Sequence, residues 1–303
     1  MLGHTDEDVP GTPDTEYDPY LYSGQQVRHN EDDFAGLFPD NNLARQAFSD
    51  VVEKVRSDRS SYEHVEQFLV VNDFKEPLKS WSGTDTEASP TEESDSIWTG
   101  YFRFSFLCLP RDPRRGWILG GGDHEFGAVD HLLTLKKQQH QVHSRHARLL
   151  HNENGVWMLH NDKRKVIVDG KEKVSGMRQM GEQITSLTFG DLTYHLKWFT
   201  SSESWYRDQL QNFRTRFGMG HVAHPRSLSL TPSDAFVEHK DYYFHRPFAA
   251  GGFGTIISAT EKSTGKIVGV KRFKKTRQNK HSIDLEIQLY NRIGLSHVSV
   301  LLS

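Results

Sequence analysis

Residues 248–256 read Phe248-Ala249-Ala250-Gly251-Gly252-Phe253-Gly254-Thr255-Ile256, and the next apolar run ends in Val268-Gly269-Val270-Lys271. The glycines permit backbone angles that a Cβ forbids, so a hairpin tip built from them can lie close over a phosphate chain. The β-branched residues after Gly254 predict that the segment continues as a strand. Lys271, at the end of the following strand, can then reach the same phosphates.

Two other glycine loops do not fit this stretch. A dinucleotide-binding fingerprint opens a helix, whereas Thr255, Ile256 and Ile257 favour a strand. A phosphate loop of the Gly-Lys-Ser/Thr type needs a hydroxyl residue after Lys266, and Ile267 stands there. The alternative that remains is a glycine-rich hairpin with an ordinary surface lysine.

A helix is expected over residues 283–292, with Ser282 as its N-cap. Ile283, Glu286 and Tyr290 recur at helical spacing, which places Glu286 on the apolar face that packs against the sheet. A carboxylate in that position needs a cationic partner, and we expect the partner to be Lys271. The alternative is a solvated glutamate on a mixed surface helix.

These motifs resemble the small lobe of the protein kinase family, whose signature is Gly-x-Gly-x-x-Gly-x-Val followed by Val-Ala-Ile-Lys. Ala249 stands at the first glycine, and Gly269 at the alanine of the second motif. The resemblance implies ATP as the cofactor, with residues 248–256 over the phosphates. It also implies that Lys271 orients the phosphates and that Glu286 fixes Lys271.

The His-Arg-Asp and Asp-Phe-Gly motifs of the kinase large lobe are not found before the sequence ends at Ser303. Those motifs position the acceptor hydroxyl and hold magnesium. We therefore expect a truncated kinase that is inactive alone, and we expect magnesium only together with the missing large lobe.

Strand patterns dominate residues 98–199. Phe102, Phe104 and Phe106 alternate with polar residues, and other short apolar runs are separated by turns. Asn154-Gly155 and Asp169-Gly170 are strong signals for tight turns. About a hundred residues of short strands and turns predict a β-sandwich.

This order of strands resembles a forkhead-associated (FHA) domain, a phosphothreonine-binding sandwich. His146 stands at the family's structural histidine, Gly121 at its phosphate-binding arginine, His143 at its serine and Arg164 at its asparagine. Ser144, Arg145 and Arg164 remain as candidate phosphopeptide-binding residues, because hydroxyl and cationic side chains hold phosphate. Phosphopeptide binding and a scaffold without a ligand are both open.

We expect a multidomain chain, in which an all-β FHA-like sandwich precedes the α+β small lobe of a protein kinase, with disordered and helical flanking segments. The expected divisions are a disordered acidic tail (1–40), a helical segment (41–79), an acidic linker (80–97), the sandwich (98–200), a helix and linker (201–238) and the incomplete small lobe (239–303). Within the linker, the polar residues 227–234 are expected to be a flexible tether.

Composition restricts the function classes. The net charge of −3 argues against nucleic-acid binding as the main activity. Cys108 is the single cysteine, so no internal disulfide forms, and no apolar run is long enough for a membrane span. His124, His131, His140, His143 and His146 lack a metal-site pattern, and no metal site is expected. We expect the protein in the nucleus or cytoplasm.

The two resemblances together imply a serine/threonine kinase of the checkpoint type. Its partners would be protein substrates and, through the sandwich, phosphothreonine proteins. The rival hypothesis is a non-catalytic phosphodependent adaptor or a pseudokinase fragment.

Overall fold

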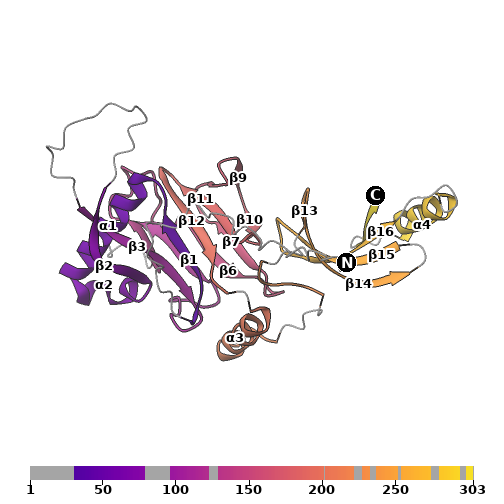
Figure 1. The fold of residues 1–303 in the computed structure, drawn as a ribbon, viewed down its shortest axis with the longest axis horizontal. Helices are drawn as coiled ribbons and strands as arrows, with labels where there is room; N and C mark the ends of the chain where they lie inside the picture. Colours follow the sequence, from indigo (N-terminus) through magenta and orange to yellow (C-terminus); the bar gives the residue numbers. More distant parts are fainter. Residues whose placement is uncertain are drawn as a thin grey trace, which may run out of the picture.

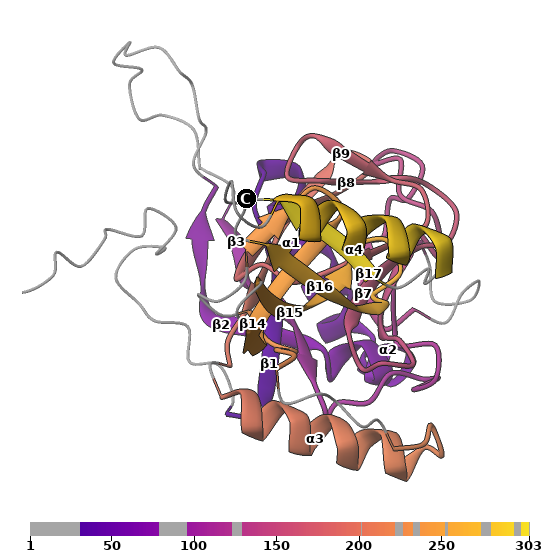
Figure 2. The same cartoon turned by 90° about the vertical axis from the view of Figure 1, so that its right-hand side faces the viewer.

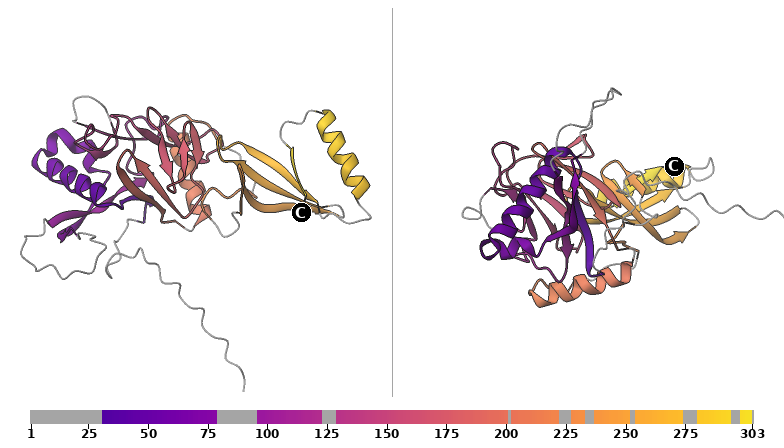
Figure 3. Two further views of the ribbon diagram at one scale, coloured as in Figure 1. Left: turned by 90° about the horizontal axis from the view of Figure 1, so that it is seen from above. Right: turned by 60° about the vertical axis from the view of Figure 1, so that its left-hand side comes forward.

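The computed structural model describes residues 31–78, 96–122, 129–200, 202–221, 227–232, 237–251, 254–273, 280–293 and 298–302. Two facing sheets and their covering helices form the larger part of the molecule, and a third sheet extends from one end of it (Figure 1). The view from above shows the same elongated arrangement, with helix α4 (Lys280–Ile293) at the far end from helix α1 (Asn42–Ser57) (Figure 3).

The two facing sheets form the sandwich. The seven-stranded sheet has the order β2 (Leu69–Pro77), β3 (Ser96–Ser105), β1 (Asp33–Pro39), β12 (Leu192–Trp198), β11 (Ile184–Phe189), β8 (Val166–Val168) and β9 (Glu172–Val174). The five-stranded sheet has the order β10 (Met177–Gln179), β7 (Trp157–Asn161), β6 (Ala147–His151), β4 (Trp117–Gly121) and β5 (His131–Thr134).

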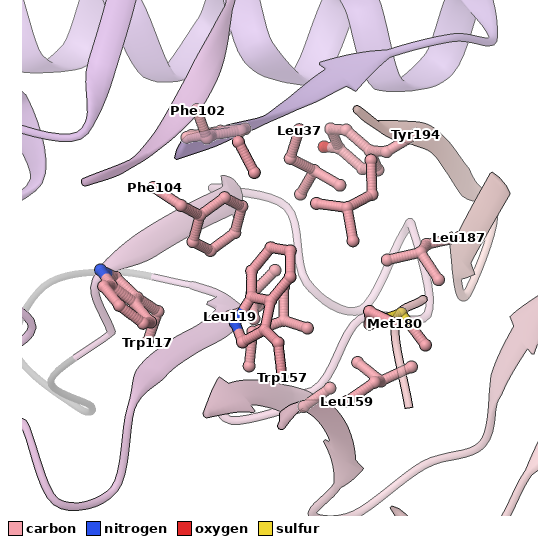
Figure 4. Packing of buried hydrophobic residues seen from close by; sticks show 14 of the residues in the cluster. Leu37, Phe102, Phe104, Trp117, Leu119, Trp157, Leu159, Met180, Leu187 and Tyr194 are labelled. Atoms are coloured by element: carbon pink, nitrogen blue, oxygen red, sulfur yellow. The ribbon is translucent and has the colours of Figure 1, made fainter. Parts of the chain in front are cut away.

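The sandwich core follows from strand alternation. In β12, Leu192, Tyr194, Leu196 and Trp198 are buried, while the residues between them are half-buried. These side chains meet those of the facing sheet around Trp157, which Figure 4 shows beside Phe104 and Leu119. The predicted β-sandwich is therefore present.

Turn chemistry sets the register of one hairpin as the sequence predicts. Residues 169–171 connect β8 to β9, and the Lys171 N–H donates to the Val168 carbonyl oxygen around Asp169 and Gly170, which have φ of +50° and +68°. Positive φ at both central residues is what a type I′ turn requires, and Asp-Gly adopts it at low cost.

The expected tail at 1–40 is wrong for residues 33–39. This segment is β1, which lies between β3 and β12 near the middle of the seven-stranded sheet. Phe34, Ala35 and Leu37 are fully buried, and burial of this apolar run outweighs the acidic, turn-rich composition around it. The sandwich thus begins at Asp33 instead of residue 98. Residues 1–30 lie outside the described part of the chain.

The helical segment expected at 41–79 is a part of the same core. The apolar stripe of Ala47, Phe48, Val51, Val52 and Val55 is buried along α1, and Asn41 caps the helix by accepting the Ala44 N–H at 2.9 Å. Helix α2 (Arg59–Glu66) follows, and β2 then pairs with β3. Of the linker expected at 80–97, residues 80–95 lie outside the described residues, and Ser96 and Ile97 begin β3.

The helix expected after the sandwich is α3 (Glu203–Arg216), which runs along one side of the molecule (Figure 2). Tyr206 and Leu210 are fully buried against the sandwich core. The flexible tether expected at 227–234 is wrong for residues 227–232, because Leu228, Leu230 and Thr231 are buried there. Leu228 and Leu230 pack into the sandwich core, and Glu203, distant in sequence, accepts the N–H groups of Leu230 and Thr231.

The third sheet has the order β13 (Val237–His239), β14 (Tyr242–Gly251), β15 (Gly254–Glu261), β16 (Ile267–Phe273) and β17 (Val298–Leu302). We call it the C-terminal sheet. Its first four strands are antiparallel, and β17 pairs in parallel with β16 after α4. Helix α4 begins at Lys280, so Ser282 lies inside it and is not its N-cap. None of the helices in the described residues is long and apolar enough to cross a membrane.

Replacing Phe34 with Ala tests whether β1 belongs to the sandwich. We expect the free energy of unfolding to fall by about 3–5 kcal/mol, because a fully buried ring is removed from the core. Leu43→Ala on α1 is the control, since that side chain is 48 % exposed. Denaturant unfolding of both variants measures the difference, and equal losses would contradict the placement of β1.

Candidate functional site

The glycine-rich stretch forms the hairpin between β14 and β15. Gly251 pairs with Gly254, Ala250 with Thr255 and Ala249 with Ile256. Phe248 is 55 % exposed, and Ala249 to Gly251 are exposed as well. The backbone of this hairpin is therefore open to a ligand. Gly252 and Phe253, at its tip, lie outside the described residues.

Gly254 has no room for a side chain. A Cβ there would lie 2.4 Å from the carbonyl oxygen of Arg272 on the neighbouring strand. A larger residue would push β15 away from β16, and Lys271 on β16 would then shift relative to the hairpin.

Lys271 and Glu286 meet, as the helical spacing predicts. Lys271 Nζ donates a hydrogen bond to Glu286 Oε1, and the two side chains are 22 % and 28 % exposed. Lys271 is also the cross-strand partner of Ile256, so it shares a sheet face with the residue two positions beyond Gly254. The amine of Lys271 further lies 4.9 Å from the centre of the Phe273 ring.

This arrangement can hold an anion near the hairpin. A partly buried ammonium group keeps its position when a carboxylate hydrogen-bonds to it from one side. Ile283, expected on the inner face of α4, is buried. The side chain of Tyr290, expected on the same face, lies outside the described residues.

The candidate phosphopeptide residues lie on two adjoining loops at one end of the sandwich. Ser144 and Arg145 precede β6, and Arg164 lies between β7 and β8. The loops are joined because Asp162 N–H donates to the carbonyl oxygen of His146, and Arg164 donates to that of Gln141 at 3.1 Å. The structure therefore brings the three residues to one end of the fold.

Lys137 is a residue of this end that the sequence did not single out. Gly121 is the last residue of β4 and Gly122 follows it, and a Cβ at Gly122 would lie 3.0 Å from Lys137 Cδ and 3.6 Å from its Nζ. The lysine side chain thus lies beside Gly121, the position where the FHA resemblance expects an arginine. Only the pair Lys136-Lys137 in the sequence could have signalled it.

Neighbouring cations at this end differ in their partners. Lys136 forms an ion pair with Asp50 at 2.7 Å, and Arg148 forms one with Asp162 at 3.2 Å. Within the described residues, Lys137 and Arg145 have no carboxylate partner. Within that part of the chain, no carboxylate competes with an anion from solution for these two charges.

His146 is structural, as its position in the sequence pattern predicts. It is fully buried against the Phe189 ring, and its Nδ1 accepts the N–H of His143 at 3.3 Å. Burial lowers the pKa of His146 to about 4, so the imidazole is neutral at physiological pH. It fixes the loop that carries Ser144 and Arg145.

Comparison with protein-family models and with curated protein sequences gives no match. Among solved structures, the crystal structure of Rad53 1–466 in complex with AMP-PNP is similar to 60 % of this chain, with 18 % sequence identity and a TM-score of 0.33. The chain spans 41 % of the Rad53 chain that it matches.

The stability of the sandwich is expected to fall as the pH drops from about 6.5 to 4. Over this range the unfolded state binds a proton at His146 that the folded state does not, because the folded pKa is about 4. The contribution of this group is complete above the unfolded pKa and amounts to roughly 3 kcal/mol. Urea unfolding at several pH values measures this effect. The free energy of unfolding should depend less steeply on pH in His146→Gln than in the wild type, and the same pH dependence in both would contradict a buried, neutral His146.

Proposed function

We propose that residues 237–302 are the nucleotide-binding small lobe of a serine/threonine protein kinase, with ATP as the nucleotide. The observation that carries this proposal is the contact between Lys271 and Glu286 on the sheet that also bears the exposed glycine hairpin. The glycine-rich stretch, the lysine and the helical glutamate are separate signals in the sequence, and all three come together there. A plain hairpin with a surface lysine gives no reason for the carboxylate to contact that amine.

Each part has a chemical role in the proposal. The backbone of residues 248–256 covers the phosphates, Lys271 neutralises and orients them, and Glu286 keeps Lys271 in place. The chemistry of phosphoryl transfer itself comes from ATP and its magnesium ions, which a large lobe would hold. Specificity for serine and threonine rests on the pairing with an FHA-like sandwich and is an analogy.

Replacing Lys271 with Met tests the nucleotide site. In the full-length protein we expect the affinity for ATP to fall at least about tenfold, because a charge-assisted contact to phosphate is lost. Arg272→Met is the matched control, since Arg272 is an exposed cation on the same strand. Calorimetric titration with a non-hydrolysable ATP analogue measures both, and equal affinities would refute the assignment.

A second candidate function is recognition of phosphothreonine by the end of the sandwich. The observation that favours it is the side chain of Lys137, which lies over Gly121 and Gly122 and has no carboxylate partner among the described residues. We infer that Lys137 supplies the cation that an arginine provides in the FHA family, with Ser144, Arg145 and Arg164 around it. A hydroxyl and several cations are a suitable donor set for a dianionic phosphate.

Lys137→Met should weaken binding of phosphothreonine peptides about tenfold, because a charged donor to phosphate contributes roughly 1.5–3 kcal/mol. Lys136→Met is the control, since that lysine is already paired with Asp50. Loss of this surface ion pair should change the stability of the fold little. Binding of a phosphopeptide library to the isolated chain gives the readout. Binding that ignores dephosphorylation of the peptides would mean that the sandwich is a scaffold.

Together, the two proposals imply a protein of the nucleus or cytoplasm. Its partners would be protein substrates and phosphothreonine proteins. The rival, an adaptor or pseudokinase, predicts nucleotide or phosphopeptide binding without transfer. Incorporation of phosphate into a protein substrate by the full-length protein separates the two.

A further inference from the structure

The C-terminal sheet contacts the sandwich through residues 261–266, which are the last residue of β15 and the turn that leads to β16. Asn152 Nδ2, in the turn between β6 and β7, donates to the carbonyl oxygens of Thr264 at 3.1 Å and Gly265 at 3.2 Å. From β10, the N–H of Gln179 donates to the carbonyl oxygen of Lys262 at 2.7 Å. Three backbone carbonyl groups of one turn are thus satisfied by the sandwich.

Close packing accompanies these hydrogen bonds. Gly265 is buried, and a Cβ there would lie 2.4 Å from Asn152 Nδ2 and 2.7 Å from Met158 Sδ. Its φ of +66° also favours glycine. Ile267, the first residue of β16, packs against the core of the sandwich. A side chain at this position would therefore have to displace the Asn152 amide that donates to the turn.

A third contact lies beside the turn. Tyr243 on β14 is buried and donates its hydroxyl to Glu182 Oε1 at 3.0 Å. Burial raises the pKa of Tyr243 well above its ordinary value, so the hydroxyl keeps its proton and remains a donor. Lys262 lies over the Tyr243 ring, with its amine 5.2 Å from the ring centre.

The segment 227–232 provides a second, separate anchor. Glu203 on α3 accepts the N–H groups of Leu230 and Thr231 at 2.9 and 3.0 Å and the Thr231 hydroxyl at 2.7 Å. On the other side, Ser227 contacts the Ser258 hydroxyl at 2.6 Å, and the Ser229 N–H donates to His245 Nδ1 at 3.3 Å. The segment therefore connects α3 to β14 and β15.

We propose that the β6–β7 turn and β10 of the sandwich form a docking surface for residues 261–266, and that this contact holds the C-terminal sheet in its folded arrangement. The inference goes beyond nucleotide binding and does not depend on it. Strand β15 runs from the docked turn to Gly254, so the sandwich fixes the end of the strand opposite the glycine hairpin. Seven residue steps along the strand, from Gly254 to Glu261, separate the two ends by about 23 Å.

Amide hydrogen exchange on the whole chain, without nucleotide, tests the proposal with two glycine variants. Gly265→Ala introduces a Cβ that must displace Asn152 Nδ2, the donor to this turn, and Met158 Sδ. Gly170→Ala is the matched control, because its φ of +68° gives the same backbone strain with nothing within 4 Å of the added Cβ. We expect exchange in residues 254–273 to rise about tenfold in the first variant only, as the loss of one or two hydrogen bonds implies.

A second variant replaces the donor without changing the size of the side chain. Asn152→Asp keeps the oxygen that accepts the Val156 N–H at 2.9 Å, but it sets a carboxylate oxygen against two carbonyl groups. Asn154→Asp is its control, because the contact of Asn154 with Gly265 is long, at 3.5 Å. A rise in exchange confined to residues 254–273 supports the proposal. Unchanged exchange there, or an equal rise in β6 and β7, overturns it.

Discussion

The packing of Phe34 is the contact on which the rest of the structure depends. Its ring lies within 6.4 Å of rings from both sheets of the sandwich, including Phe104, Trp157 and Trp198, and 5.5 Å from Tyr206 on α3. Helix α3 in turn carries Glu203, which holds the segment before the C-terminal sheet. A core contact near the start of the described chain is therefore connected, through one helix, to the sheet near its end.

The two candidate sites use charge in different ways. At the C-terminal sheet, Lys271 is held by Glu286, so its amine has a defined position before any ligand arrives. At the end of the sandwich, Lys137 and Arg145 have no carboxylate partner within the described residues, whereas nearby Lys136 and Arg148 do. The first arrangement favours orientation of a ligand, and the second favours attraction of a dianion.

Local patterns predicted much of this fold. The strands from β3 to β8, the stripe on α1 and the approach of Glu286 to Lys271 all follow from periodicity and turn residues. Strand β1 was missed because its seven residues follow a polar, acidic stretch, and only its partners β3 and β12 make it a central strand. Residues 227–232 and Lys137 were missed because their environment comes from distant parts of the chain, which composition does not encode.

The position of β2 at the outside of the seven-stranded sheet has a consequence for solubility. Within the described residues, one row of its backbone N–H and C=O groups faces no neighbouring strand, and such a row is a template for pairing with another copy. Asp73 and Lys75 are exposed there, with Phe74 between them. Charged side chains oppose edge-to-edge association of strands. Asp73 and Lys75 therefore disfavour aggregation at the exposed, apolar Phe74.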